Sequence, residues 1–97
     1  MTEGLLKDVK NYLDITWEDP ESDKKLAGMI NRGISYIDDK GGEKFNYNEE
    51  GKARMLLLNY VMYERSGILH EFFGAYQDEI IALQLGAKVK NNAETEE

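Results

Sequence analysis

The sequence predicts an all-α fold, a small bundle of four helices with a flexible C-terminal tail. Three observations support this prediction. Apolar residues recur at steps of three and four along most of the chain, as they do on one face of an α-helix. The 97 residues include a single proline, so long helices are possible. The helical segments are separated by short stretches rich in glycine or in acidic residues, which are typical of connections between helices.

The length of the chain corresponds to one domain. We assign residues 1–86 to a helical domain and residues 87–97 to a disordered C-terminal tail, because Val89 is the only large aliphatic residue in the tail. A compact monomer of this mass exposes about 5,600 Å², and folding buries roughly two thirds of the surface of the unfolded chain. That burial is enough for one modest core.

The first predicted helix covers residues 3–13, where Leu5, Val9 and Leu13 recur at helical spacing with polar residues between them. Residues 14–23 follow as an acidic connector that contains five carboxylates and no basic residue. Ile15 and Trp17 are the apolar residues of this connector. We therefore expect the connector to be anchored to the core by these two side chains.

The second predicted helix runs from Pro20 to about residue 40. Asp19 supplies an N-cap oxygen, and proline is favourable at the first helical position because its missing N–H would have no partner there. The two glycines at residues 41–42 end the helix, since one of them can adopt the left-handed conformation. Gly33 lies on the apolar stripe. A glycine inside a helix costs about 0.8–1 kcal/mol relative to alanine, so we expect close helix packing at Gly33.

The third predicted helix begins with Asn48 as its N-cap and ends near Ser66. It follows a loop, residues 41–48, in which Phe45 and Tyr47 point the same way if the segment is extended. Apolar residues lie on almost every side of this third helix. We therefore expect it at the centre of the bundle, or at the centre and in contact with a partner.

The fourth predicted helix covers residues 69–85, after a break at Gly67, and Gly86 is expected to end it. Its apolar residues include three aromatic side chains near its start and a group of aliphatic side chains near its end. These residues are Phe72, Phe73, Tyr76, Ile80, Ile81, Leu83 and Leu85.

Composition and charge exclude several classes of function. The chain has 12 basic and 19 acidic residues, so its formal net charge is −7 and a fold-wide positive field for nucleic-acid binding is absent. It has no cysteine, which excludes disulfides, thiolate nucleophiles and cysteine-ligated metals and fits a cytosolic protein. The apolar runs, such as residues 55–58, are short, so we expect neither a signal peptide nor a membrane span.

Catalytic chemistry has little support in the sequence. His70 is the only histidine, and no motif links it to Ser22, Ser35 or Ser66 in a nucleophilic triad. No second histidine follows at the spacing of the zinc proteases. We therefore expect no catalytic residue and no cofactor.

A metal site is not expected either. Asp19, Glu21 and Asp23 alternate as at the start of a calcium-binding loop. The sixth and twelfth positions of such a loop require glycine and glutamate, and here they are Lys24 and Ile30. Carboxylates that stabilise the start of a helix explain this acidic run better.

Large apolar side chains are the one positive signal for function. Four short helices in a small domain do not cover every aromatic ring, although each ring taken alone is more often part of a core. So many large side chains on a small body favour an oligomer or a binding module. The candidate interface residues are Trp17, Phe45, Tyr63, Phe72, Phe73 and Tyr76.

The order and pattern of the helices also resemble a known family. The chain opens with the helical segment Leu5–Ile15. A second helix follows, with Leu26–Ile30 and then Tyr36-Ile37 before the glycine turn. The third helix is apolar with Arg54 near its start, and the final helix carries aromatic residues. This layout, over residues 4–86, is similar to that of the small α-helical head–tail connector (adaptor) proteins of tailed bacteriophages and prophages.

The resemblance implies a structural, non-enzymatic function. Connectors of this kind form a ring beneath the portal protein, extend the DNA channel and carry further neck or tail-completion proteins. The expected partners are therefore other copies of the chain, in a cyclic oligomer of about twelve subunits, the portal protein and the downstream neck proteins. DNA would pass through non-specifically, since a negatively charged wall repels its backbone. The expected location is the virion neck, and the bacterial host cytoplasm before assembly.

Ring closure requires a head-to-tail interface made of two different surfaces on each subunit. We expect the outward face of the first two helices to meet the fourth helix of a neighbour, and the tail of residues 87–97 to order against the portal. The alternative is a bacterial helical protein–protein interaction or dimerisation module. A small enzyme is the least favoured function, because no acid–base or nucleophile arrangement is present.

Overall fold

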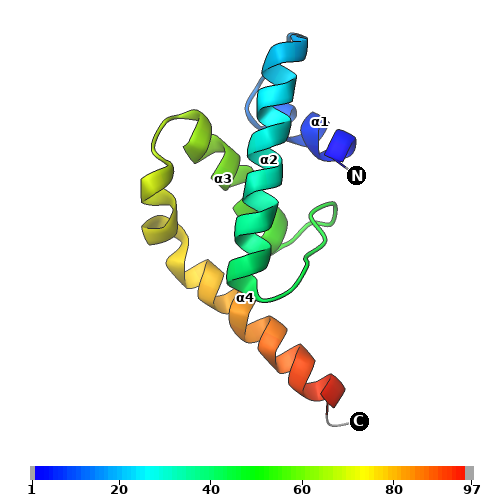
Figure 1. The fold of residues 1–97 in the computed structure, drawn as a ribbon, viewed down its shortest axis with the longest axis vertical. Coiled ribbons are helices and arrows are strands. Elements are labelled where there is room, and N and C mark those ends of the chain that lie inside the picture. Colours follow the sequence, from blue (N-terminus) through cyan, green and yellow to red (C-terminus); the bar gives the residue numbers. More distant parts are fainter. Residues whose placement is uncertain (1, 96–97) are drawn as a thin grey trace.

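The computed structural model describes residues 2–95, and the side chains of residues 4–88 within that range. Its elements are α1 (Thr2–Tyr12), α2 (Pro20–Gly41), α3 (Lys52–Arg65), a short 3₁₀ turn η1 (Leu69–Glu71) and α4 (Phe72–Thr95), as Figure 1 shows. All the regular elements in the described part of the chain are helical. The predicted all-α fold of four helices is therefore confirmed.

The molecule is elongated, with extents of 50 × 27 × 18 Å. α2 contacts α1, α3 and α4, and the distal half of α4 extends past the C-terminal end of α2 (Figure 1). The radius of gyration is 14.4 Å, whereas a compact domain of this length has about 12.5 Å. The accessible surface is 6442 Å², against about 5,600 Å² for a compact monomer. The subunit thus exposes more surface than its mass requires.

Both ends of α2 follow the local signals in the sequence. The Asp19 carboxylate accepts the backbone N–H of Glu21 at 3.1 Å and the Ser22 hydroxyl at 3.0 Å. At the other end Gly42 is left-handed with φ 84°, and its N–H donates to the Asp38 carbonyl at 2.9 Å. The predicted N-cap and the predicted glycine stop are confirmed.

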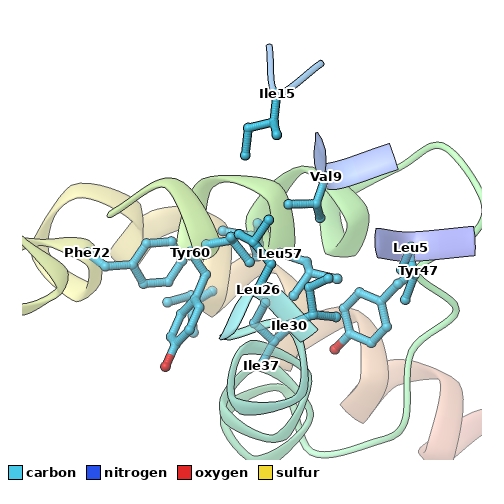
Figure 2. Packing of buried hydrophobic residues seen from close by; sticks show 13 residues of the cluster. Leu5, Val9, Ile15, Leu26, Ile30, Ile37, Tyr47, Leu57, Tyr60 and Phe72 are labelled. Carbon is cyan, nitrogen blue, oxygen red and sulfur yellow. The ribbon is translucent and has the colours of Figure 1, made fainter. Parts of the chain in front are cut away.

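The core lies where α1, α2 and α4 surround α3. Figure 2 shows the buried side chains converging from all four helices and from both long connectors. α3 contacts every other helical element, so its predicted central position is confirmed. The buried apolar side chains are Leu5, Val9, Ile15, Leu26, Ile30, Ile37, Tyr47, Leu56, Leu57, Tyr60, Val61, Phe72, Ile80 and Ala87.

α2 and α3 pack tightly against each other at Gly33. A Cβ atom at this position would lie 2.8 Å from Leu57 Cδ1 and 2.8 Å from Tyr60 Cδ1. Such distances are shorter than carbon–carbon contact allows, so the crossing requires a residue without a side chain. The helix-propensity cost of Gly33 is offset by the packing of Leu57 and Tyr60 on the α2 backbone.

The loop between α2 and α3 is fastened to the last turns of α2. The Tyr47 hydroxyl donates to Asp38 Oδ1 at 2.6 Å, and the backbone N–H of Phe45 donates to the same oxygen at 3.1 Å. The Phe45 ring covers Gly41 and leaves no space for a Cβ there. Burial of the Tyr47 ring, and then the hydrogen bond and negative charge of Asp38, raise the pKa of this hydroxyl.

The predicted start of α3 is wrong. α3 begins at Lys52 after Gly51, and no side chain caps it. The backbone N–H of Asn48 donates to the side chain of Asn46 at 3.0 Å, so Asn48 belongs to a turn. The asparagine signal therefore fixes a bend in the loop, and the helix starts four residues later.

The predicted course of α4 also needs correction. The chain enters α4 through the 3₁₀ turn, and Tyr76 has non-helical angles (φ −119°, ψ 20°) that divide the helix. Gly86 does not end the helix, which continues to Thr95 and buries Ala87. The sequence after Gly86 has neither a proline nor another glycine, so nothing there stops the helix. Of the predicted tail, residues 87–95 form the last turns of α4, the side chains after residue 88 are outside the described part, and residues 96–97 lie outside it altogether.

We predict opposite effects of alanine at two glycines of α2. Gly33→Ala should lower the free energy of unfolding, because overpacking costs about 1–3 kcal/mol and exceeds the gain in helix propensity. Gly28→Ala should raise it by up to about 1 kcal/mol, since the added Cβ meets only the flexible Arg32 guanidinium, at 3.3 Å. Urea unfolding measures both variants. Equal stabilisation by the two substitutions would contradict the close crossing.

A second prediction concerns pH. The raised pKa of Tyr47 means that the unfolded chain loses this proton first, so stability is complete below about pH 10 and falls above it. Tyr47→Phe should cost about 1.5–3 kcal/mol near neutral pH, the value of a hydrogen bond to a charged group. It should also reduce the loss of stability between about pH 9 and about pH 11. Urea unfolding across this range tests both effects, and an unchanged slope would contradict the assignment.

Candidate assembly surfaces

The six predicted interface residues fall into three groups. Phe72 is 1% exposed and lies in the core, where its ring is 5.4 Å from Tyr60 and 5.7 Å from Tyr63 between ring centroids. The expectation that Phe72 belongs to an uncovered patch is therefore wrong. The first turn of α4 directs this ring toward α3, as Figure 2 shows for Phe72 and Tyr60.

Three other candidates are partly covered by the core. Phe45 lies over α2, while Tyr63 and Tyr76 pack edge to face at 5.7 Å and flank the Phe72 ring. Burial raises the pKa of the Tyr76 hydroxyl, and the neighbouring Tyr63 adds to this effect. Tyr63 and Tyr76 attach α4 to α3, and Phe45 holds the preceding loop on α2, so all three rings have a structural role.

Trp17 and Phe73 are exposed. Trp17 is 54% exposed on the connector before α2. Phe73 is 43% exposed, and Lys40 Nζ lies 5.9 Å from its ring centroid. Sequence reasoning placed both residues at an interface, but the two side chains belong to separate surfaces.

Sequence reasoning missed four exposed apolar residues, which are Tyr12, Ile68, Ile81 and Leu85. For Ile81 and Leu85 a signal was available. They are four residues apart on α4, and no charged residue occurs between Glu79 and Lys88. In a chain with 32% charged residues, a helical stretch without charges favours burial of one side against the subunit's own core and of the other side against a second molecule.

The first candidate surface is the arm face, which we define as Ile81, Ala82, Leu85 and Gly86 in the middle of α4. Ile81 is 42% exposed and Leu85 is 57% exposed, and Ala82 and Gly86 are exposed beside them. The opposite side of the helix carries the buried Ile80 and Ala87. The Gln84 side chain also donates to the Lys40 carbonyl at the end of α2, at 2.7 Å. The arm face therefore points away from the subunit.

The second candidate surface is the α2 groove. Two adjoining hollows of about 210 and about 630 Å³ run along the N-terminal half of α2 and share Lys25 and Met29. Apolar side chains and a glycine form the floor, and the rim carries four basic side chains and one carboxylate, Glu21. The α2 groove is defined by Ile15, Trp17, Glu21, Ser22, Lys24, Lys25, Leu26, Gly28, Met29, Arg32 and Arg65.

The rim of the α2 groove is positive although the whole chain is acidic. Arg32 is paired with Glu64, with Nε and Nη2 at 2.8 and 2.7 Å from Oε1. Within the described residues, no carboxylate forms an ion pair with Lys24, Lys25 or Arg65. The groove thus combines apolar floor residues with three cations available to an acidic partner.

The reactive residues do not converge. His70 is exposed, with its ring 4.0 Å from the Glu71 carboxylate, and Ser22 is engaged in the cap of α2. Among the described residues, no group of three or more metal-binding side chains is close enough to hold an ion. None of the helices in the described range has the length and apolar character needed to cross a bilayer. The arm face and the α2 groove are the candidate sites for a partner.

Comparison with known proteins gave no match among protein-family models, curated proteins or solved structures. The function is therefore inferred from the surfaces of this chain.

The difference between the two adjacent phenylalanines yields a prediction. Phe72→Ala should lower the free energy of unfolding by about 3–5 kcal/mol, because it empties the space between the α3 and α4 rings. Phe73→Ala should cost much less, since its ring is half exposed. Urea unfolding of the two variants is the measurement. Equal losses would contradict this assignment of the two rings.

Proposed function

We propose that this protein is a non-enzymatic head–tail connector of a tailed bacteriophage or prophage. Copies of the chain form a ring under the portal protein, extend the DNA channel and carry the next neck or tail-completion protein. The helix order and apolar patterns described above resemble that family. The proposal includes the portal protein and the downstream neck proteins as the binding partners of the ring.

One observation carries the proposal. The subunit has two unlike apolar surfaces, the α2 groove and the arm face, on different parts of an elongated body. A symmetric dimer needs one self-complementary surface, whereas a ring needs two different surfaces that fit each other. Two unlike surfaces on one chain therefore favour cyclic assembly.

The charge of the chain supports passage of DNA. The formal net charge is −7, and the cations Lys24, Lys25 and Arg65 gather beside an apolar floor that another protein can cover. Once these cations are covered by a neighbour, the remaining surface is more acidic than the chain as a whole. An acidic channel wall repels the phosphate backbone and lets the genome slide without binding.

A dimerisation module is the second candidate function, and one observation favours it. Asp78 and Lys88 flank the arm face at equal distances in sequence from residue 83, so two antiparallel copies of α4 would place each acid opposite a base. Such a dimer would use the arm face alone and leave the α2 groove free. The oligomeric state therefore separates the two functions.

We predict that the mass in solution rises with concentration from a monomer to closed rings of about twelve subunits, between micromolar and near-millimolar protein or on addition of portal protein. Analytical ultracentrifugation gives the mass and negative-stain electron microscopy shows the rings. Rings that bind the portal would support the connector. A dimer whose mass is constant over the whole range, with no portal binding, would overturn it.

A further inference from the structure

We propose that the arm face of one subunit docks into the α2 groove of a neighbouring copy, and that this contact is the repeating interface of the assembly. The inference rests on the proposed ring, and it specifies which residues meet. The occupant of the groove is a second copy of this chain because the chain itself carries an exposed helix face with apolar anchor residues and with acidic residues at one end.

The shapes agree. Ile81 and Leu85 are one helical turn apart on an exposed helix, which is the spacing of the anchor residues that a helix inserts into an apolar groove. The groove offers Met29 on its floor and the half-exposed Trp17 as one wall. A tryptophan exposed beside a hollow is typical of the residues that contribute most to interface energy.

Glycine on both surfaces lets the helices approach closely. A Cβ at Gly28 would meet only the Arg32 guanidinium, at 3.3 Å, and a Cβ at Gly86 would meet no atom within 4 Å. Each glycine lowers helix stability by about 0.8–1 kcal/mol, and neither one lets two elements of the described subunit approach, in contrast to Gly33. Docking of α4 on the α2 of a neighbour would use both glycines.

The charges agree as well. The groove rim carries Lys24, Lys25 and Arg65 without ion-pair partners in the described part of the chain. The arm face is uncharged, with Asp78 and Glu79 before it and Lys88 after it on the same helix, so its acidic end is the end that can meet the basic rim. Two acidic subunits repel each other at long range. Attraction between the basic rim of one subunit and the acidic residues of the other is therefore needed to set the orientation of the contact.

The arm face cannot reach the groove of its own subunit. The arm face surrounds Gln84, which contacts Lys40 near the C-terminal end of α2, whereas the groove lies along the N-terminal half of α2, and in Figure 1 α4 runs on away from that half. Every subunit therefore keeps one groove and one arm for two different neighbours. This arrangement closes into a ring when the rotation between neighbours is suitable, and gives an open filament when it is not.

Two substitutions of one exposed residue test the charge match. Leu85→Lys and Leu85→Glu both remove the anchor side chain, and both replacements are good helix formers. Leu85→Lys makes the chain less acidic and Leu85→Glu makes it more acidic, so net repulsion alone predicts better assembly of Leu85→Lys. Docking in the basic groove predicts the reverse. We expect Leu85→Lys to raise the apparent dissociation constant at least about tenfold, and Leu85→Glu to have a smaller effect.

A mixing experiment tests the two-sided contact. Gly28→Gln fills the groove with a bulkier residue that also favours the helix. Gly28→Gln and Leu85→Lys should each be monomeric by native mass spectrometry, and their equimolar mixture should give one-to-one dimers, since one intact groove and one intact arm remain. Ile68→Ser removes an exposed apolar side chain that lines neither surface, and should assemble as the wild type does.

The outcomes separate the interface from the proposed function. A mixture of the two variants that stays monomeric, or rings that form despite both substitutions, would overturn the docking. Rings insensitive to both substitutions would overturn the docking and leave the connector proposal standing. Open filaments or dimers that require both surfaces would support the docking and contradict the ring. A wild-type chain that stays monomeric at near-millimolar concentration would also overturn docking between copies.

Discussion

The close crossing of α2 and α3 at Gly33 is the constraint on which the rest of the structure depends. It presses Leu57 and Tyr60 onto the α2 backbone and makes α3 the central helix. Tyr60 then stands within 5.4 Å of the Phe72 ring, between centroids, so the first turn of α4 is fixed by aromatic packing. The break at Tyr76 redirects the helix, and α4 leaves the body of the molecule as an arm.

The exposed surfaces follow from this arrangement. α4 is held at its start by rings and near its middle by the contact of Gln84 with the end of α2, so one side of the arm has no covering in the subunit. α2 is covered by α3 on one side and leaves the groove beside Trp17 open on another. The accessible surface of 6442 Å² is that of a core centred on one side of α3, with every helix covered only in part. The two uncovered regions differ in charge, which is why we infer contact between unlike surfaces.

Local sequence signals predicted some elements correctly and misplaced others. α2 was predictable because Asp19, Pro20 and Gly42 act through their own backbone angles and hydrogen bonds. The end of α4 was not, because Gly86 remains helical when no other residue stops the helix. Which of Phe72 and Phe73 is buried depends on the rotation of α4 about its axis, and the 3₁₀ turn that sets this rotation has no clear sequence signal. The groove was not predictable from the sequence, because the segment around Trp17 is acidic and the basic residues of the groove rim come from α2 and α3, which are distant in sequence.

The fluorescence of Trp17 tests the central claim most directly, because it is the only tryptophan in the chain and it forms a wall of the groove. Its side chain is exposed in the subunit, so the dilute protein should emit at long wavelength and be quenched by acrylamide. If a second copy covers the groove, emission should move to shorter wavelength and quenching should fall as the oligomer forms. Oligomers in which Trp17 stays as accessible to acrylamide as in the monomer would contradict the account.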